Sequence, residues 1–79
     1  MFQVTRSPKF YHYRNKNESD RDWVLHRMTY IPIEIQEEVA NNYEKLFLAA
    51  GGGRRAANTY LNYTAKEQYK IHQKERANG

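Results

Sequence analysis

Residues 32–61 read PIEIQEEVANNYEKLFLAAGGGRRAANTYL, a pattern that predicts two helices on either side of a glycine turn. Proline is favoured at the first helical position, and the acidic residues that follow Pro32 lie near the positive end of the helix dipole. We expect this helix to bury the apolar residues that recur at helical spacing, namely Ile35, Val39, Tyr43, Leu46, Phe47 and Ala50. Its other polar side chains are expected in solvent, including Glu34, Glu37, Asn41, Glu44 and Lys45.

The second helix is predicted from Arg54 to about Ala77, because this segment has no proline or glycine and is rich in Ala, Lys, Gln and Glu. Its buried side is marked by four residues at a spacing of four, Ala57, Leu61, Ala65 and Tyr69. The apolar stripe fades after Tyr69, so residues 72–79 are expected to project from the body or to fray.

A shorter helix is predicted upstream of Pro32. The sequence Ser19-Asp20-Arg21-Asp22 fits a capping box, and the helix would run from there to Met28. A strand is the alternative, since one side of a period-two pattern carries Val24, His26, Met28 and Tyr30.

Residues 2–6 and 10–14 are the candidate strands of an N-terminal hairpin. An isolated hairpin is marginal, so residues 1–16 must pack on the helices or stay loose. The expected fold class is mainly α, in a single domain of residues 1–79. Two long helices surround a Gly-rich turn, preceded by a short helix and, where residues 1–16 pair, by a β-hairpin.

The chain has 79 residues, no cysteine, and 13 Lys and Arg against 9 Asp and Glu. A domain of this length buries only about 60 to 65% of the surface that its unfolded chain exposes, which leaves little room for a deep catalytic cleft. The residue types of an acid–base or metal site are present in His12, His26, Asp20 and Asp22, but their spacing matches no motif such as His-Glu-x-x-His. We therefore expect a protein that is not an enzyme and needs no cofactor or metal.

The longest apolar run, Leu46 to Ala50, is far shorter than the roughly 20 residues that span a bilayer. The lack of cysteine fits a reducing compartment. Together these features predict a cytoplasmic protein with no membrane partner.

Charge is distributed in three blocks. Residues 1–16 carry four bases and no acid (+4), residues 17–50 carry three bases and seven acids (−4), and residues 51–79 carry six bases and two acids (+4). Either the basic ends pack over the acidic middle, in the fold or in self-association, or one of them faces an anionic partner.

The second helix carries a basic and amide-rich row with no acid in it. Every fourth residue belongs to the row: Arg54, Asn58, Asn62, Lys66, Lys70 and Lys74. Because four residues overshoot one turn, only the three lysines share a face. Lysines at this spacing repel one another by about 0.2 to 0.5 kcal/mol per pair, and the one acid at helical spacing from them is Glu67, three residues before Lys70. Either nearby acids neutralise the row, or an anionic partner relieves the repulsion.

The turn Gly51-Gly52-Gly53 leads into Arg54 and Arg55, which oppose the helix dipole at a cost of about 0.3 to 1 kcal/mol each. A bound phosphate or carboxylate would convert free glycine N–H groups and two guanidinium groups into an anion site. The structural alternative is that both arginines stabilise the negative C-terminal end of the preceding helix. A P-loop is not supported, because no Lys-Ser or Lys-Thr pair follows the glycines.

Residues 9–14, KFYHYR, combine aromatic and basic side chains. Rings that stack on bases and cations that follow phosphates are typical of single-stranded nucleic-acid binding. The same residues also fit a strand that faces the core.

The segment RRAANTYL, residues 54–61, resembles helical segments of small bacteriophage accessory proteins that act on replication or recombination machinery. The resemblance implies a binding protein that recruits, blocks or redirects a host enzyme. It assigns no functional residue.

The basic surface supports two functional hypotheses. In the first, a small non-enzymatic accessory protein binds and modulates a protein of nucleic-acid metabolism, in replication, recombination or defence, by contacting an acidic surface of that host enzyme. The second is direct, sequence-tolerant binding of DNA or RNA by the basic C-terminal helix. The low net charge of +4 and the lack of a helix-turn-helix signature favour the first. Both hypotheses use the same residues: Arg54, Arg55, Asn58, Asn62, Lys66, Lys70 and Lys74. The sequence leaves the oligomeric state open.

Overall fold

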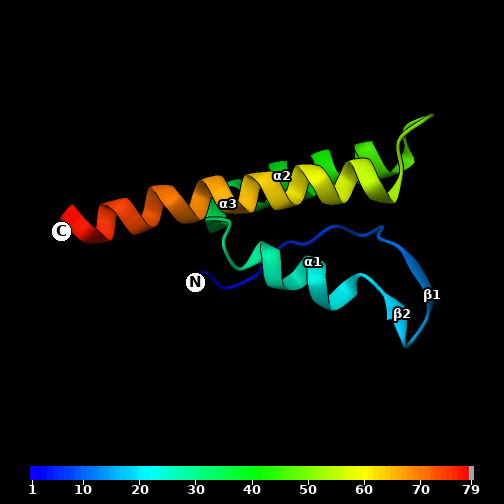
Figure 1. Ribbon diagram of the computed structural model, residues 1–79, viewed down its shortest axis with the longest axis horizontal. Helices are drawn as coiled ribbons and strands as arrows, with labels where there is room; N and C mark the ends of the chain where they lie inside the picture. Colours follow the sequence, from blue (N-terminus) through cyan, green and yellow to red (C-terminus); the bar gives the residue numbers. More distant parts are fainter. Residues whose placement is uncertain (79) are drawn as a thin grey trace.

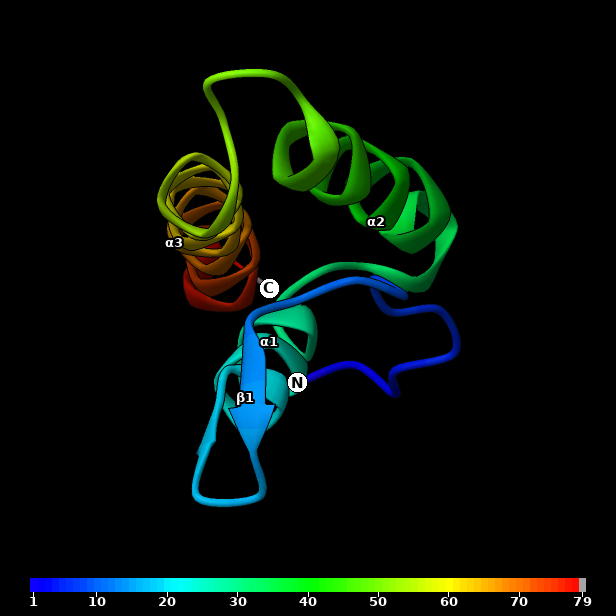
Figure 2. The same ribbon diagram turned by 90° about the vertical axis from the view of Figure 1, so that its right-hand side faces the viewer.

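The computed structural model describes residues 1–78 of the chain, with side chains for residues 1–73. Its elements follow in the order β1 (Tyr13–Asn15), β2 (Glu18–Ser19), α1 (Arg21–Met28), α2 (Ile33–Leu48) and α3 (Arg54–Asn78). The long helices α2 and α3 lie side by side, and α1 and the N-terminal segment lie on one side of this pair (Figure 1, Figure 2). The mainly helical fold, with two long helices around a glycine turn, is confirmed.

The helix α2 forms where predicted, with small shifts at both ends. Pro32 is its N-cap, and Ile33 is its first helical residue. The helix ends at Leu48, and Ala49 already has extended backbone angles. Ala50 therefore lies past the end of the helix and is exposed, so its predicted burial is wrong.

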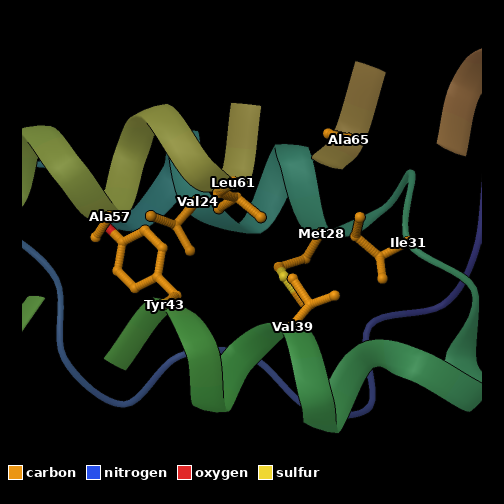
Figure 3. Close-up of a cluster of buried hydrophobic side chains, with 8 residues drawn as sticks. All are labelled: Val24, Met28, Ile31, Val39, Tyr43, Ala57, Leu61 and Ala65. Atoms are coloured by element: carbon orange, nitrogen blue, oxygen red, sulfur yellow. The ribbon is translucent and has the colours of Figure 1, made fainter. Parts of the chain in front are cut away.

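The core is shared by all three helices. It is the cluster of Val24, Met28, Ile31, Val39, Tyr43, Ala57, Leu61 and Ala65 (Figure 3). Two of the predicted core residues of α2, Val39 and Tyr43, are inside it. Of the other four, Ala50 is exposed, and Ile35, Leu46 and Phe47 are half-buried and pack against its edge. They stay at the rim because the buried line of α2 runs through Gln36, Val39, Ala40 and Tyr43.

The helix α3 buries Ala57, Leu61 and Ala65, as the spacing of four predicts. Tyr69, the fourth member, is 50% exposed, so the buried stripe ends one turn earlier than predicted. The helix continues to Asn78, and its C-terminal part extends past the N-terminal end of α2 (Figure 1). None of the helices in the described part of the chain combines the length and apolar character that a membrane span needs.

The helix α1 confirms the helical prediction for this segment and excludes the alternative strand. Its N-cap is Asp20, not Ser19. The Ser19 hydroxyl accepts the N–H of Arg21 (3.1 Å), so the predicted capping box with Asp22 does not form. The Asp20 carboxylate makes no capping bond. It accepts hydrogen bonds from Arg54 and Asn58 of α3 instead.

The N-terminal hairpin is present, but residues other than the predicted ones form it. Its strands β1 and β2 pair antiparallel, with Tyr13 opposite Ser19 and Asn15 opposite Glu18. Asn15 Oδ1 accepts the N–H groups of Asn17 (2.8 Å) and Glu18 (2.9 Å), which closes the turn. The predicted pairing of residues 2–6 with residues 10–14 is wrong, because the first of these segments bonds to α2.

Gln36 of α2 holds this first segment. Its side chain is fully buried, and its Oε1 accepts the N–H groups of Thr5 (2.9 Å) and Arg6 (3.2 Å). Its Nε2 donates to the carbonyl oxygens of Gln3 (2.7 Å) and Ile31 (3.0 Å). The donors and the acceptor of this buried amide are therefore all satisfied. They supply the hydrogen bonds that a partner strand would otherwise give to the N-terminal segment.

Glu44, about two helical turns after Gln36 on α2, binds the next part of the N-terminal segment. Its Oε2 accepts the N–H of Lys9 (2.7 Å) and a guanidinium N–H of Arg6 (3.1 Å). Burial alone would raise the pKa of Glu44, but these hydrogen bonds and the two nearby positive charges outweigh it, and the pKa is lowered. The expected exposure of Glu44 in solvent is therefore wrong.

The turn between α2 and α3 needs its glycines for backbone reasons. Gly51 and Gly53 have positive φ angles of 79° and 103°. A Cβ on Gly52 would lie 2.4 Å from the Leu46 carbonyl oxygen. The Gly53 N–H donates to this same oxygen (3.0 Å), and the Gly52 N–H donates to that of Ala49 (2.9 Å). Two of the three glycine N–H groups thus close the C-terminal end of α2.

Candidate functional site

The predicted binding row on α3 divides into two parts. In the first part, Arg54 and Asn58 turn toward Asp20 at the start of α1. Arg54 donates Nε to Asp20 Oδ2 (2.8 Å) and Nη2 to Oδ1 (2.9 Å), which makes a two-pronged ion pair. Asn58 Nδ2 donates to the same Oδ2 (2.8 Å). These two members of the row therefore have partners inside the fold.

Tyr43 of α2 completes the group, which we call the Asp20 cluster: Asp20, Tyr43, Arg54 and Asn58. The Tyr43 hydroxyl donates to Asn58 Oδ1, so the cluster joins all three helices. Burial and the nearby negative charge of Asp20 raise the pKa of Tyr43 to about 12. The hydroxyl therefore stays protonated and acts as a donor at neutral pH.

Charge in the Asp20 cluster is balanced locally. Burial alone would raise the pKa of Asp20, but the hydrogen bonds from Arg54 and Asn58 and the charge of Arg54 outweigh it, so the pKa lies below its ordinary value of 3.8. The hydrogen bond to Asp20 in turn raises the pKa of Arg54. The carboxylate also puts a negative charge near the start of α3, which is the sign that the helix dipole favours.

The predicted anion site at the turn keeps few free donors. The N–H groups of Gly52 and Gly53 bind carbonyl oxygens of the preceding residues, and the guanidinium of Arg54 binds Asp20. Arg55 is exposed and makes no ion pair with a described side chain. The partner of Arg54 is the N-cap of α1 and not the end of α2, so neither sequence-based alternative describes this residue.

The second part of the row lines a groove of about 470 Å³ between α1 and α3, which we call the α1–α3 groove. From α1 and the turn after it come His26, Arg27 and Tyr30. The helix α3 contributes Asn62, Ala65, Lys66, Tyr69, Lys70 and Gln73. None of these lining residues is acidic, so the groove is basic.

Aromatic rings form one wall of the groove. Tyr30 packs edge-to-face against His26 and Tyr69, with ring centroids 5.4 Å and 5.5 Å apart. Ala65, which is 3% exposed, also lines the groove and belongs to the core. The groove therefore has an apolar interior that is continuous with the core.

Three cations accompany this aromatic wall. The Arg27 guanidinium lies 4.5 Å from the centre of the Trp23 ring and 3.0 Å from His26 Nδ1, which fixes it against α1. Lys66 and Lys70 are exposed and make no ion pair with a described side chain, and Glu67 does not neutralise Lys70. The two lysines are thus the available cations of the groove. The side chain of Lys74, the next member of the row, lies outside the described residues.

Sequence reasoning missed His26, Arg27 and Tyr30 as groove residues. Helical spacing does not link all three, because His26 and Arg27 lie in the last turn of α1 and Tyr30 follows the end of the helix. The pattern could not show that this side of α1 packs on α3, and the groove exists because it does.

The aromatic and basic residues 9–14 do not form a strand that faces the core. Tyr11 packs against the core, but Phe10 and Tyr13 are 45% and 61% exposed. These residues are also not part of the α1–α3 groove.

The four residues that were considered for acid–base or metal chemistry do not form one site, although His12 and Asp20 are neighbours, since the Asp20 N–H donates to the His12 carbonyl oxygen (2.9 Å). Asp20 is bound by Arg54, whereas His26 lines the α1–α3 groove. Among the described residues, no group of three or more His, Asp or Glu side chains is placed to hold a metal ion.

Comparison with protein-family models, with curated proteins and with solved structures finds no match for this chain. The functional argument therefore rests on the groove and on the Asp20 cluster.

Proposed function

We propose that this protein is a small non-enzymatic accessory protein that binds an acidic surface on a protein of nucleic-acid metabolism and modulates that protein. The observation that carries the proposal is the α1–α3 groove, where three cations accompany an aromatic wall and none of the described lining residues is acidic. An acidic partner surface complements this charge, and it relieves the repulsion between Lys66 and Lys70 at their spacing of four.

The proposed contact is confined to the groove end of α3. Arg54 and Asn58 already bind Asp20, so their polar groups are not available in the way that the exposed lysines are. Asn62 adds an amide to the contact, and Lys74 continues the row in the sequence.

The class of partner is proposed from the resemblance of residues 54–61 to segments of small bacteriophage accessory proteins. That resemblance implies a host enzyme of replication, recombination or defence, and a chain without cysteine suits the bacterial cytoplasm where such enzymes work.

The test is capture of a partner from a nuclease-treated bacterial lysate by the immobilised protein. The unchanged chain is compared with the double variant Lys66→Glu/Lys70→Glu. The matched control is Lys16→Glu/Lys45→Glu, which changes the net charge equally at two exposed positions outside the groove.

We expect the unchanged chain and the control to retain an acidic protein, and the groove variant to lose it by about tenfold or more. The loss should be largest at low ionic strength, because exposed charges are screened by salt. Equal retention by all three chains would overturn the proposal.

Direct binding of single-stranded nucleic acid is the second candidate function, and it is favoured by the two tyrosines beside the lysines of the groove. Its log affinity for a generic oligonucleotide should fall linearly with log salt, with a slope of about −0.7 per neutralised phosphate. Absence of binding at about 50 mM salt, where such contacts are strong, removes this candidate.

A further inference from the structure

We infer that the α1–α3 groove takes a short acidic peptide segment of the partner, with one large apolar or aromatic side chain inserted into the groove and carboxylates bound by Lys66 and Lys70. This inference rests on the proposed function and names what the partner presents to the groove.

The interior of the groove calls for an inserted side chain. Tyr30 and Tyr69 form its wall, Ala65 lines it from the core side, and its volume of about 470 Å³ lies within the range of ligand pockets, about 300 to 1,000 Å³. A flat acidic surface would bind the lysines but leave this apolar interior in water. A peptide with one apolar anchor fills it and gains from the burial.

The lysines match an extended acidic peptide. Lys66 and Lys70 are four residues apart, which is a rise of about 6 Å along the helix. Alternate residues of an extended chain point to the same side and lie about 6.6 Å apart. Two acidic residues at alternate positions of the peptide can therefore face the two lysines.

A single strand of nucleic acid fits the same groove less well, because the described cations do not continue toward the start of α3. Toward the start of α3 the row continues with Asn62 and Asn58, and Arg54 is neutralised by Asp20. The Arg27 guanidinium is held against Trp23. Strands bound without sequence preference need a longer positive groove with successive open rings, and Tyr30 already packs against rings on two sides.

The inference is tested with synthetic ligands and the full chain, by calorimetry and by backbone amide chemical shifts. The probe is a peptide of about ten residues with acids at alternate positions beside one phenylalanine. One control peptide has serine in place of the phenylalanine, another has amides in place of the acids, and an oligothymidylate of similar length represents nucleic acid.

The protein variants separate the anchor from the charges. Tyr69→Ala removes one of the two tyrosine rings of the groove wall, and Tyr69→Phe keeps the ring as its matched control. The double variant Lys66→Glu/Lys70→Glu is again compared with Lys16→Glu/Lys45→Glu. The peptide controls leave the protein unchanged, so they test the inference even where Tyr69→Ala alters the local fold.

We expect the acidic phenylalanine peptide to shift amide signals around the groove. Its affinity should fall about tenfold to hundredfold when serine replaces phenylalanine or when Tyr69 becomes alanine, which corresponds to losing one large buried side chain. The amide peptide and the groove double variant should also bind weakly, whereas Tyr69→Phe and the Lys16/Lys45 control should bind normally.

Equal affinity of the phenylalanine and serine peptides would overturn the inference, and so would binding of the oligothymidylate at the groove in place of the peptide. If no peptide binds but lysine-dependent capture from the lysate persists, the inference is wrong and the proposed function stands. If that capture also fails, the proposed function is wrong as well.

Discussion

The two parts of the row on α3 have opposite fates although they share residue types and spacing. Arg54 and Asn58 are bound by Asp20, whereas Lys66 and Lys70 stand at an open groove. The difference comes from α1. Its N-cap, Asp20, places a carboxylate at the start of α3, whereas its last turn and the turn after it place rings and a cation beside the two lysines. A basic row is therefore neutralised or available according to the residues of another helix that face it.

The largest expected effect is on stability, and it compares a buried residue near the first part of the row with a groove residue near the second. Leu61→Ala should lower the free energy of unfolding by about 2 to 5 kcal/mol, because Leu61 is fully buried beside the Asp20 cluster part of α3. Tyr69→Ala should cost only about 1 kcal/mol, since Tyr69 is half exposed and loses mainly its ring contact with Tyr30. Urea unfolding measures both, and equal costs would show that the groove wall is as much a part of the core as Leu61.

The next effect concerns the carboxylate that neutralises Arg54. Asp20→Ala should lower the free energy of unfolding by about 2 to 3 kcal/mol, because it removes charged hydrogen bonds from Arg54 and Asn58. The loss is limited because Arg54 is half exposed, so water can hydrate the guanidinium group that Asp20 no longer binds. The matched control is Asp22→Ala, since Asp22 lies two residues after Asp20, in the first turn of α1, but its side chain is 96% exposed.

The control should change stability by about 0.5 kcal/mol or less. The same two variants can also be tested for binding of an anionic peptide by Arg54. If Asp20→Ala also creates binding of an anionic peptide at the start of α3, the contrast between the two parts of the row is due to Asp20 alone. Similar unfolding free energies for both variants would contradict the structural role of the cluster.

Local patterns were sufficient to predict the helices. Periodicity placed Val39 and Tyr43 of α2 and Leu61 of α3 inside, because helical spacing alone determines which residues share a face. The same reasoning placed Ile35 and Leu46 too deep, since the width of the buried side depends on how the neighbouring helices approach.

Polar partners could not be predicted from local patterns. Arg54 and Asp20 are 34 positions apart, and Arg6 and Glu44 are 38 positions apart. Gln36 gave no signal at all, because a glutamine on a helix is ordinarily solvated and its burial depends on a segment 30 or more positions away. Of the candidate site, the sequence supplied the lysines of the row, and the tertiary fold supplied the rings and the cation that face them.

The smallest effect is the pH dependence of the neutralised part of the row. The folded-state pKa values of Asp20 and Glu44 lie below their ordinary values of 3.8 and 4.5. At neutral pH both carboxylates are ionised, and their contribution to stability is fully present. Below the ordinary values the unfolded chain binds protons that the folded chain does not yet bind, so stability falls as the pH drops through the folded-state pKa values.

The variant Asp20→Asn removes the charge and keeps the shape of the side chain. Its single amide oxygen, at the place of Oδ2, can still accept from Arg54 Nε and Asn58 Nδ2, but its NH2 group replaces the acceptor of Arg54 Nη2, so one hydrogen bond is lost with the charge. At pH 7 it should be less stable than the unchanged chain, by less than Asp20→Ala. The gap should narrow as the pH falls below 3.8 and through the lowered folded-state pKa of Asp20, because the unchanged chain loses its carboxylate charge while the variant has none to lose. The changed residues of the groove double variant Lys66→Glu/Lys70→Glu have no described contact with Asp20. Adding Asp20→Asn to that variant should therefore give a stability gap that narrows with falling pH in the same way. Melting temperatures across this range measure the gap. A gap that stays constant with pH would mean that the charge of Asp20 does not distinguish the two parts of the row, and that shape and hydrogen bonding alone draw Arg54 inward.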